Sequence, residues 1–347
     1  MKTIKAIGTY AAEKPLESLQ IQRRDLTPHD VEIEIMFCGV CHSDLHAARN
    51  EWKGSHYPLV PGHEIVGKIT AIGSEVKNFE IGQIAAVGVI VDSCGHCSPC
   101  QQELEQYCDE SPTYTYNSPD KFLGGQTFGG YSKLIVTDKK FVFPLPENLD
   151  PAAAAPLLCA GITTYSPLKF WNAGPGKKVG VIGIGGLGHM AVKFAAAFGA
   201  EVIAFTHSAS KKEEAQRLGA HDVVVSSDKE DMKRYSRKLD LIINTVSAPH
   251  DINKILGLLK FNGVHALVGL PMDPFSLQPF SIVDQRKIFT GSSIGSVKET
   301  HEMLEFCGKH QITADIELIQ PHEINEAWEK MLQGKVRYRF VLDLRGL

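Results

Sequence analysis

The segment KKVGVIGIGGLGHMAVKFAAAFG, residues 177–199, decides the fold of a large part of this chain. Its first part, KKVGVIG, is typical of a buried strand, and GLGHMAVKFAAAFG is typical of a helix that ends at a glycine. The loop between them, GIGGLG, has the spacing G-x-G-x-x-G at Gly183, Gly185 and Gly188. That spacing alone is a weak signal, but a preceding strand and a following helix are the context that a dinucleotide-binding loop requires.

Each glycine of this loop has a physical role in that interpretation. Gly183 permits the tight turn, Gly185 lets the backbone approach a pyrophosphate, and Gly188 lets the helix pack closely on the sheet. Gly186 and Leu187 complete the loop, and the helix N-terminus adds free N–H groups with a positive partial charge. The alternative is a glycine-rich turn without a ligand, which the flanking strand and helix make the weaker interpretation.

Strands and helices continue to alternate on the C-terminal side of this segment. Further strands are expected at 201–205, 222–225, 240–246 and 263–270, with a helix at 211–219. Because each strand is followed by a connecting segment long enough for a crossover, the pattern predicts an α/β fold with a parallel, doubly wound sheet.

The flanking parts of the chain have a different character. Residues 1–150 are rich in strand signals, and VEIEIMF (31–37) alternates acidic and apolar residues as a half-exposed strand does. Other elements are expected as strands at 64–73, 81–90 and 337–344 and as helices at 151–171, 299–309 and 322–333. We therefore expect three parts: a β-rich catalytic domain over 1–150, an inserted doubly wound domain over 151–290, and a return to the first domain over 291–347.

The end of the second predicted strand indicates which dinucleotide binds. NAD-binding proteins usually carry an acidic residue about 20 residues after the glycine loop, but Glu201 stands at the beginning of the strand, the wrong end for a ribose. The residues at the strand's end are Thr206, His207, Ser208, Lys211 and Lys212. Hydroxyl groups and a cation suit a 2′-phosphate, so we expect NADP(H), with Lys212 or its neighbour as the cation. One of the two lysines could instead pair with the following glutamates on a solvated helix.

The composition excludes several classes of protein. The chain has 347 residues and a net charge of −4 with no basic block, so no nucleic-acid partner is expected. It contains no apolar run of about 18 residues, so no membrane span is expected. The N-terminus carries no signal-peptide pattern, which makes a cytoplasmic location the default. Cysteines stay reduced there, which favours metal binding or catalysis over disulfides.

Four of the eight cysteines lie within CGHCSPCQQELEQYC, residues 94–108. They are Cys94, Cys97, Cys100 and Cys108. Four thiolates on one short loop can surround a zinc ion and leave it no open position, which predicts a structural zinc site. An iron–sulfur cluster is the alternative, but its bacterial spacing ends in C-x3-C-P, and Cys108 is too far along and is followed by Asp109.

A second group of metal-binding residue types is spread along the chain. Cys41, His63 and Cys159 would supply two thiolates and one imidazole, a set typical of a catalytic zinc with one position open for water or substrate. The three residues lie in separate segments, so spacing supports the set only loosely. Polar neighbours of the first two are Ser43, Asp44, His46 and Glu64.

Taken together, several segments resemble the zinc-dependent medium-chain alcohol dehydrogenases. Besides the four-cysteine loop, they are GVCHSDLH (39–46), VPGHEIVG (60–67), LLCAGITTYSPL (157–168), VGVIGIGGLGH (179–189) and RYRFV (337–341). Their order and spacing are most similar to the cinnamyl alcohol dehydrogenase branch and its bacterial NADP-dependent aldehyde reductase relatives. The resemblance covers essentially the whole chain. It implies a GroES-like catalytic domain that carries two zinc ions, with an inserted Rossmann domain.

The resemblance also implies roles for single residues. Cys41, His63 and Cys159 would bind the catalytic zinc, and Glu64 would lie beside it as an alternate ligand. Asp44 would orient His63. The further residues are Ser43 next to the substrate oxygen, His46 at the outer end of a proton relay, His42, Thr163 and Leu187 at the cofactor, and Arg339 or Arg337 at a phosphate.

The implied reaction is reversible hydride transfer between NADPH and an aldehyde, which gives a primary alcohol. Four aromatic residues are expected to line the substrate pocket, namely Trp52, Tyr57, Tyr114 and Tyr116. The stretch 111–125 departs from the plant cinnamyl enzymes, so a broad range of aldehydes is expected. Two alternatives remain at this stage: a zinc polyol dehydrogenase that uses NAD, and a non-enzymatic NADP- or zinc-binding protein. A homodimer is possible.

Overall fold

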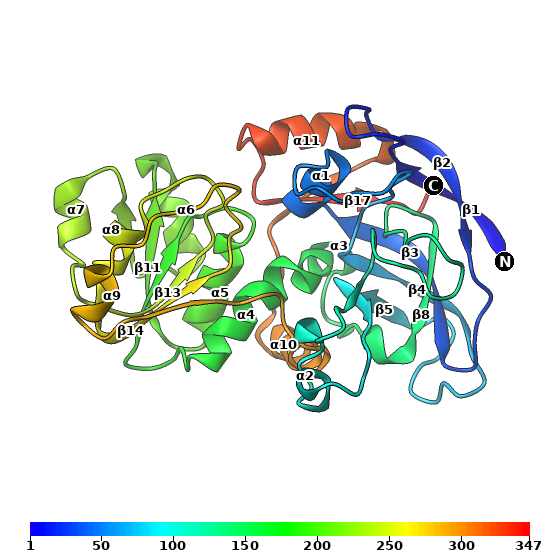
Figure 1. Cartoon of the computed structure of the whole chain (residues 1–347), viewed down its shortest axis with the longest axis horizontal. Coiled ribbons are helices and arrows are strands. Elements are labelled where there is room, and N and C mark those ends of the chain that lie inside the picture. The colour runs from blue at the N-terminus through cyan, green and yellow to red at the C-terminus, as the bar shows by residue number, and fades with distance from the viewer. The chain divides into compact units, whose positions relative to one another are not determined.

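A computed structural model describes all residues, 1–347, and divides the chain into two compact units (Figure 1). The first unit consists of Met1–Cys159 and Ser296–Leu347, and the second of Ala160–Gly295. The C-terminal segment of the chain thus packs with the N-terminal part, and in Figure 1 the red helix α11 (Ile324–Leu332) lies beside the blue helix α1 (His42–Ala48).

The second unit is built on a six-stranded parallel sheet with the order β12-β11-β10-β13-β14-β15. Its strands are β10 (Lys178–Ile182), β11 (Glu201–Thr206), β12 (Asp222–Val225), β13 (Leu239–Asn244), β14 (Leu259–Leu267) and β15 (Ile288–Gly291). The chain moves outward from β10 to β12 and then returns to place β13 on the other side of β10. Open parallel sheets bind ligands where the strand order reverses in this way, at the carboxyl ends of the strands. The predicted doubly wound sheet is confirmed, and β15 is an edge strand that the sequence did not indicate.

Helices connect these strands. They are α4 (Ala160–Phe170), α5 (Gly188–Ala197), α6 (Lys212–Arg217), α7 (Lys229–Lys233), α8 (Ile252–Leu256) and α9 (Phe280–Val283), with a short 3-10 turn η4 (Ala209–Lys211). The core of the sheet is apolar on both faces, as in buried parallel sheets, with Ile203, Phe205 and Ile242 nearly inaccessible to solvent.

The first unit is a β-rich lobe. Its main sheet runs β16-β17-β3-β4-β5-β9, and β8 also pairs with β3. The strands are β3 (Asp30–Gly39), β4 (Ile65–Ile72), β5 (Ile84–Val87), β8 (Leu134–Asp138), β9 (Val142–Pro144), β16 (Ile316–Ile319) and β17 (Arg339–Asp343). Two further strand pairs are β1 (Lys2–Gly8) with β2 (Glu17–Arg23) and β6 (Ile90–Asp92) with β7 (Thr113–Tyr114).

The helices of this lobe are short except in its C-terminal part. They are α1, α2 (Ser98–Gln101), α3 (Pro151–Ala154), α10 (Val297–His310) and α11, with the 3-10 turns η1 (Glu105–Tyr107), η2 (Lys139–Phe141), η3 (Ala155–Leu158) and η5 (Pro321–Glu323). None of the helices combines the length and the apolar character needed to cross a bilayer.

The sequence predicted that strand β3 is half exposed, and this prediction is wrong. Eight of its ten residues are buried and two are intermediate, because β17, β4 and β8 all pair with it. Even Glu32 is only 4% exposed, and its carboxylate bonds to Lys2 and to the Thr70 hydroxyl. The acidic residues that alternate along this strand therefore do not indicate a solvent-exposed face, because Glu32 is buried and bonded to other side chains.

The expected helix over 151–171 is broken in the structure. It consists of α3, η3 and α4, and the interruption falls at Cys159, whose φ and ψ are −130° and −69°. Pro156 contributes to the break because it has no N–H to donate within a helix. The first two pieces pack against β3, so the boundary between the units lies after Cys159 rather than at residue 150.

Candidate active site

Helix α1 begins at the first of the predicted metal ligands. Cys41 is its N-cap residue, and the Asp44 side chain accepts a hydrogen bond from the Cys41 backbone N–H at 2.9 Å. This is the reciprocal part of a capping box, which satisfies a donor that a helix start would leave unpaired. The same turn therefore orients the backbone of Cys41 and holds the carboxylate of Asp44 in the interior.

The structure brings Cys41, His63, Glu64 and Cys159 together. One potential ligand atom from each lies within 4.8 Å of the others, and all four residues are buried or nearly so. All four belong to the first unit. Cys159 lies at the break between η3 and α4. The change of backbone direction at this break places its side chain beside the other three residues.

The donor set suits zinc. It offers two sulfurs and one imidazole nitrogen, which zinc binds at about 2.0–2.3 Å. A hydrogen bond from the Cys159 thiol lowers the pKa of Cys41 well below its ordinary value, so the pair holds a negative charge in a buried place. A buried thiolate of this kind is stabilised by a cation, and the set leaves a fourth position for an oxygen ligand.

His63 presents one ring nitrogen to this cluster and the other to Asp44. Its Nδ1 lies 3.0 Å from Asp44 Oδ1, and the carboxylate is fully buried. Burial disfavours the imidazolium, but the charge and hydrogen bond of Asp44 outweigh burial and raise the pKa of His63. A carboxylate behind a ligating histidine fixes the tautomer and the ring orientation, which is the role that the resemblance implied for Asp44.

Glu64 is fully buried and lies beside the other three residues of the cluster. Oε1 of Glu64 pairs with Nη2 of Arg339, while Oε2 is buried without a hydrogen-bond partner. A Cβ at Gly39 would lie 1.9 Å from that unpaired oxygen, so only glycine leaves the space. Burial raises the pKa of Glu64 to about 7, against the opposing effect of Arg339. An unpaired buried carboxylate oxygen beside three metal-ligand types fits the predicted role of alternate ligand.

The outer residues of α1 face the same region. The Ser43 hydroxyl lies 3.6 Å from Cys41 Sγ, and His46 is one turn further along the helix. Nδ1 of His46 pairs with the Glu51 carboxylate, and the ring lies 5.1 Å from the ring of Trp52. Glu51 was not identified from the sequence, because it lies outside the motif and its contact depends on how the chain turns after α1.

The other predicted residues of this lobe differ in whether they contact the metal-ligand cluster. The ring of Tyr116 lies 5.7 Å from that of His63, whereas Tyr57 bonds to a backbone carbonyl of α1 and Tyr114 is 45% exposed on β7. His42 is exposed at the start of α1. Arg339 is buried against Glu64, and Arg337 is exposed, so the first guanidinium is engaged at the metal-ligand cluster.

The four cysteines of the 94–108 loop also converge. Sulfur–sulfur distances are 3.9 Å for Cys94–Cys100 and 3.9 Å for Cys97–Cys108. Backbone N–H groups of the loop lie 3.3–3.5 Å from three of these sulfurs. Desolvation works against the Cys97 thiolate, but N–H groups outweigh it and lower the pKa of Cys97 to about 7. The loop thus brings four sulfurs together, and its backbone N–H groups favour the thiolate of Cys97, whereas desolvation raises the pKa of Cys100 and of Cys108.

The glycine loop of the second unit has the geometry of a phosphate cradle. Gly183 has a φ of +86°, which glycine adopts without strain. A Cβ at Gly188 would lie 1.9 Å from the Gly183 carbonyl oxygen, so this glycine is required for the tight turn. A Cβ at Gly185 would meet nothing within 4 Å, which leaves open space at the start of α5, where Leu187 is the N-cap residue.

The end of β11 carries the residues expected at the 2′-position of the ribose. The Thr206 hydroxyl accepts from the Ser208 N–H, and Ser208 caps η4. His207 is exposed and bonds to Ser226. Lys211 Nζ donates to the Ile184 carbonyl inside the glycine loop at 3.1 Å, whereas Lys212 is exposed at the start of α6.

Two further predictions concern this unit. Glu201 lies at the beginning of β11 and pairs with Lys178 there, so it stands at the opposite end of the strand from Thr206, as expected. Thr163 is 7% exposed within α4.

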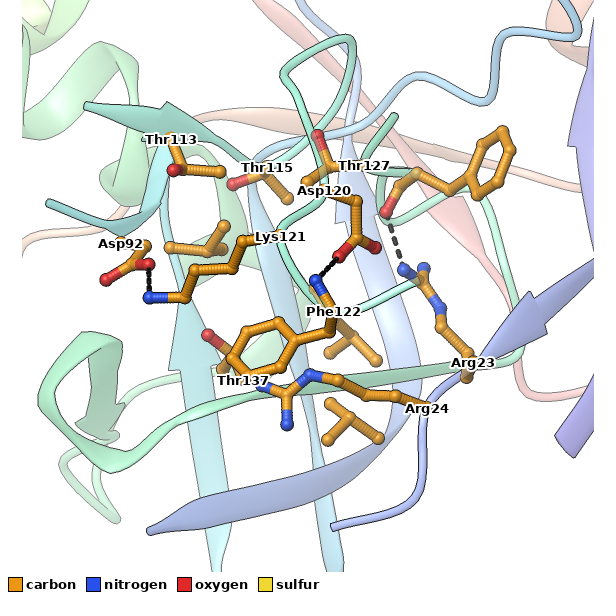
Figure 2. A pocket seen from close by; sticks show the side chains of 14 residues that line it. Arg23, Arg24, Asp92, Thr113, Thr115, Asp120, Lys121, Phe122, Thr127 and Thr137 are labelled. Atoms are coloured by element: carbon orange, nitrogen blue, oxygen red, sulfur yellow. Dashed lines mark hydrogen bonds and ion pairs between the residues drawn. The ribbon is translucent and has the colours of Figure 1, made fainter. Parts of the chain in front are cut away.

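A separate cavity in the first unit is lined by Arg23, Arg24 and the loop around Asp120 (Figure 2). Its volume is about 60 Å³, room for only a few water molecules. Lys121 pairs with Asp92 and Arg24 with Asp30, whereas the Arg23 guanidinium donates to backbone carbonyls and to the Ser132 hydroxyl. The cavity is therefore too small for a dinucleotide.

Comparisons with known proteins agree with this geometry. Residues 27–147 match the alcohol dehydrogenase GroES-like domain, and residues 186–309 match the zinc-binding dehydrogenase domain. The chain is 53% identical to aldehyde reductase YahK of Escherichia coli (strain K12) over 346 residues, which cover 99% of each chain.

Two solved structures are similar over almost the whole chain. The cinnamyl alcohol dehydrogenase SbCAD4 from Sorghum bicolor superposes with a TM-score of 0.96 at 44% identity and covers 99% of this chain and 98% of that one. The CAD from Helicobacter pylori complexed with NADP(H) gives a TM-score of 0.93 at 41% identity and covers 99% of each. The chain belongs to the zinc-dependent medium-chain alcohol dehydrogenases, in the branch of the cinnamyl alcohol dehydrogenases.

Proposed function

We propose that this protein catalyses reversible hydride transfer between NADPH and aldehydes of a broad range, which gives primary alcohols. The observation that carries the proposal is the convergence of Cys41, His63 and Cys159, with Glu64 beside them and Asp44 behind His63. Such a set holds zinc with one position open, and the glycine loop supplies the dinucleotide site.

Cys41, His63 and Cys159 would hold the zinc ion. When bound, zinc supplies Lewis-acid polarisation of the substrate oxygen, worth several kcal/mol of transition-state stabilisation. The nicotinamide supplies the hydride chemistry, and the protein aligns the reactants. Asp44 keeps the His63 ring in the ligating tautomer, and Glu64 is the alternate ligand that its unpaired Oε2 allows.

The proton required at the substrate oxygen comes from the face of α1. Ser43 donates from its hydroxyl, which lies beside Cys41 Sγ, and His46, three residues further on the same helix face, supplies the replacement proton. The bond between His46 and Glu51 holds the imidazole in place, and Glu51 is partly open to solvent. Trp52 covers one side of the His46 ring, while Tyr116 lies over His63 as part of the substrate wall.

NADP(H) is distinguished from NAD(H) at the end of β11. His207 and Ser208 offer polar side chains, and Thr206 shapes the turn by accepting from the Ser208 N–H. We assign the cation to Lys211 rather than Lys212, because its ammonium already lies at the glycine loop. A hydrogen bond to a charged group contributes about 1.5–3 kcal/mol, which corresponds to about 10–100-fold in affinity.

The test is NADPH oxidation against a panel of aliphatic and aromatic aldehydes, with NADH and Lys211→Ala as comparisons. The proposal predicts turnover of several aldehydes, a strong preference for NADPH, and a KM for NADPH about tenfold higher in Lys211→Ala with little change for NADH. Lys212→Ala is the matched control and should leave both cofactors nearly unaffected. Equal rates with NADH, or activity confined to polyol oxidation with NAD, would contradict the proposal.

The assembly is proposed to be a homodimer formed through the second unit. Strand β15 is the edge of the parallel sheet, and edge strands offer unpaired N–H and C=O groups to another chain. Apolar side chains gather in the same part of the sequence, with Phe280 83% and Val283 71% exposed. Light scattering should give twice the chain mass for the wild type, and the monomer mass for Phe280→Glu.

A cytoplasmic location is part of the proposal. Eight cysteines are free, and six of them belong to the two metal-ligand clusters, which requires that these six stay reduced, as cytosolic thiols do.

A further inference from the structure

The segment Gly129–Tyr131 runs alongside the metal-ligand segment that ends in His63. Backbone hydrogen bonds join Gly129 N to Val60 O at 2.8 Å, Gly130 N to Gly62 O at 2.8 Å and Tyr131 N to Pro61 O at 2.9 Å. Three consecutive residues are thus paired with the three residues directly before His63. The position of Tyr131 relative to the metal site is fixed by its own main chain.

The Tyr131 ring is fully buried against Gly62. Its relative exposure is 0%, and a Cβ at Gly62 would lie 2.6 Å from the Tyr131 ring carbon Cδ1. Gly62 also has a φ of +104°, which favours glycine. The close contact between ring and backbone leaves the hydroxyl directed at one group, the Asp44 carboxylate, at 3.2 Å from Oδ2.

This hydroxyl completes the hydrogen bonding of Asp44. Oδ1 accepts from Gly62 N and His63 Nδ1, and Oδ2 accepts from Cys41 N and the Tyr131 hydroxyl. A carboxylate has about four acceptor sites, so all four are occupied. Two donors are backbone groups at or next to metal ligands, the third is a ligand itself, and the fourth, Tyr131, is a side chain from outside the ligand set. Tyr116 is a second tyrosine that interacts with Asp44.

We propose that Tyr131 is a positioning residue of the metal site, whose hydroxyl fixes the Asp44 carboxylate and thereby the orientation of His63. The inference rests on the proposed binding of zinc by Cys41, His63 and Cys159. Without the hydroxyl, Oδ2 keeps only the Cys41 N–H, the carboxylate can rotate, and Oδ1 no longer holds His63 Nδ1 in one geometry. Groups that orient metal ligands typically affect metal affinity or activity by about 10–100-fold.

The hydroxyl is suited to this role because it stays protonated. Burial and then the negative charge of Asp44 raise the pKa of Tyr131 well above its ordinary value. The protonated form, which donates to Asp44, is therefore favoured.

The test is Tyr131→Phe, with zinc content measured by mass spectrometry after dialysis against graded concentrations of a chelator. The expected result is a zinc dissociation constant about 10–100-fold higher at one of the two sites, with the four-cysteine zinc retained. Aldehyde reduction should fall in parallel and recover when zinc is added, a rescue that a general loss of packing would not show. Tyr235→Phe is the matched control, since it removes another tyrosine–aspartate bond, of 2.7 Å to Asp222, in the other unit.

A double-mutant cycle with Asp44→Asn shows whether Tyr131 acts through Asp44. If it does, Tyr131→Phe has little further effect on zinc affinity in the Asp44→Asn background. Unchanged zinc affinity in Tyr131→Phe, additive effects in the cycle, or a variant that does not fold or also loses the four-cysteine zinc would each overturn the assignment. Failure of the proposed function is distinguishable, because the wild type would then hold no zinc outside the four-cysteine loop.

Discussion

The two metal-ligand clusters of this chain are built in opposite ways. The ligands of the four-cysteine cluster lie on one loop of residues 94–108, and backbone N–H groups of the same loop support their sulfurs. The ligands at 41, 63 and 159 come from a helix start, a loop before β4 and a break between helices. The first site is complete within its own loop, whereas the second exists only when the whole lobe is folded.

This difference has a chemical consequence. Four sulfurs saturate a tetrahedral ion and leave it inert toward substrate. The second, dispersed site (Cys41, His63 and Cys159) supplies two sulfurs and an imidazole. Its remaining neighbour, Glu64, is paired with Arg339, so one position can take a substrate oxygen. Such an open site depends on side chains that touch no metal, above all Asp44 and its four hydrogen bonds.

The largest effect is expected when one ligand of the site at Cys41, His63 and Cys159 is removed. Cys159→Ser should keep the four-cysteine zinc, lose the other, and reduce kcat/KM by about 10³-fold, since several kcal/mol of Lewis-acid stabilisation disappear. Zinc content and aldehyde reduction measured on the same sample check this. Cys307→Ser is the matched control, because Cys307 belongs to neither cluster. Two zinc ions per chain in active Cys159→Ser would refute the assignment.

A smaller effect is expected from Asp44→Asn. The amide keeps the shape of the carboxylate but replaces one acceptor oxygen by a donor, so either His63 or a backbone N–H loses its partner. We expect kcat/KM to fall about 10–100-fold, with the loss greatest at low zinc concentration. Steady-state kinetics over a range of free zinc would measure it, and an activity within twofold of the wild type would count against the role of Asp44.

The smallest effect on turnover is expected from Cys97→Ser in the other cluster. Its zinc is lost and the loop unfolds, but the dispersed site stays intact, so kcat/KM per folded molecule should remain within about threefold of the wild type. Stability suffers instead: a loss of about 3 kcal/mol would lower Tm by about 6–12 °C for a domain of this size. Calorimetry and limited proteolysis of the loop report the change. A loss of turnover as large as that of Cys159→Ser would mean that the two clusters are not independent.

The same contrast explains how much the sequence could predict. The glycine loop and the four-cysteine loop were predictable because local spacing sets their geometry, and the alternation of elements after residue 177 predicted the parallel sheet. Pairings between distant segments were not predictable. The burial of β3 depends on three partner strands, and the contact of Arg339 with Glu64 joins residues 275 positions apart.

The dispersed cluster lies between these cases. Cys41 and His63 were identified through their motifs, but spacing alone could not select Cys159, because the helix break that positions it follows from how η3 and α4 pack. Glu51 and Tyr131 carry no local signal at all. Their importance comes from single hydrogen bonds to His46 and Asp44 across the fold.

The most direct measurement is a crystal structure with anomalous scattering data collected on both sides of the zinc absorption edge. The account predicts two zinc peaks per chain, one bonded to Cys94, Cys97, Cys100 and Cys108, and one bonded to the sulfurs of Cys41 and Cys159 and to His63 Nε2. A single peak within the four-cysteine loop, in crystals grown from protein that actively reduces aldehydes, would contradict the account.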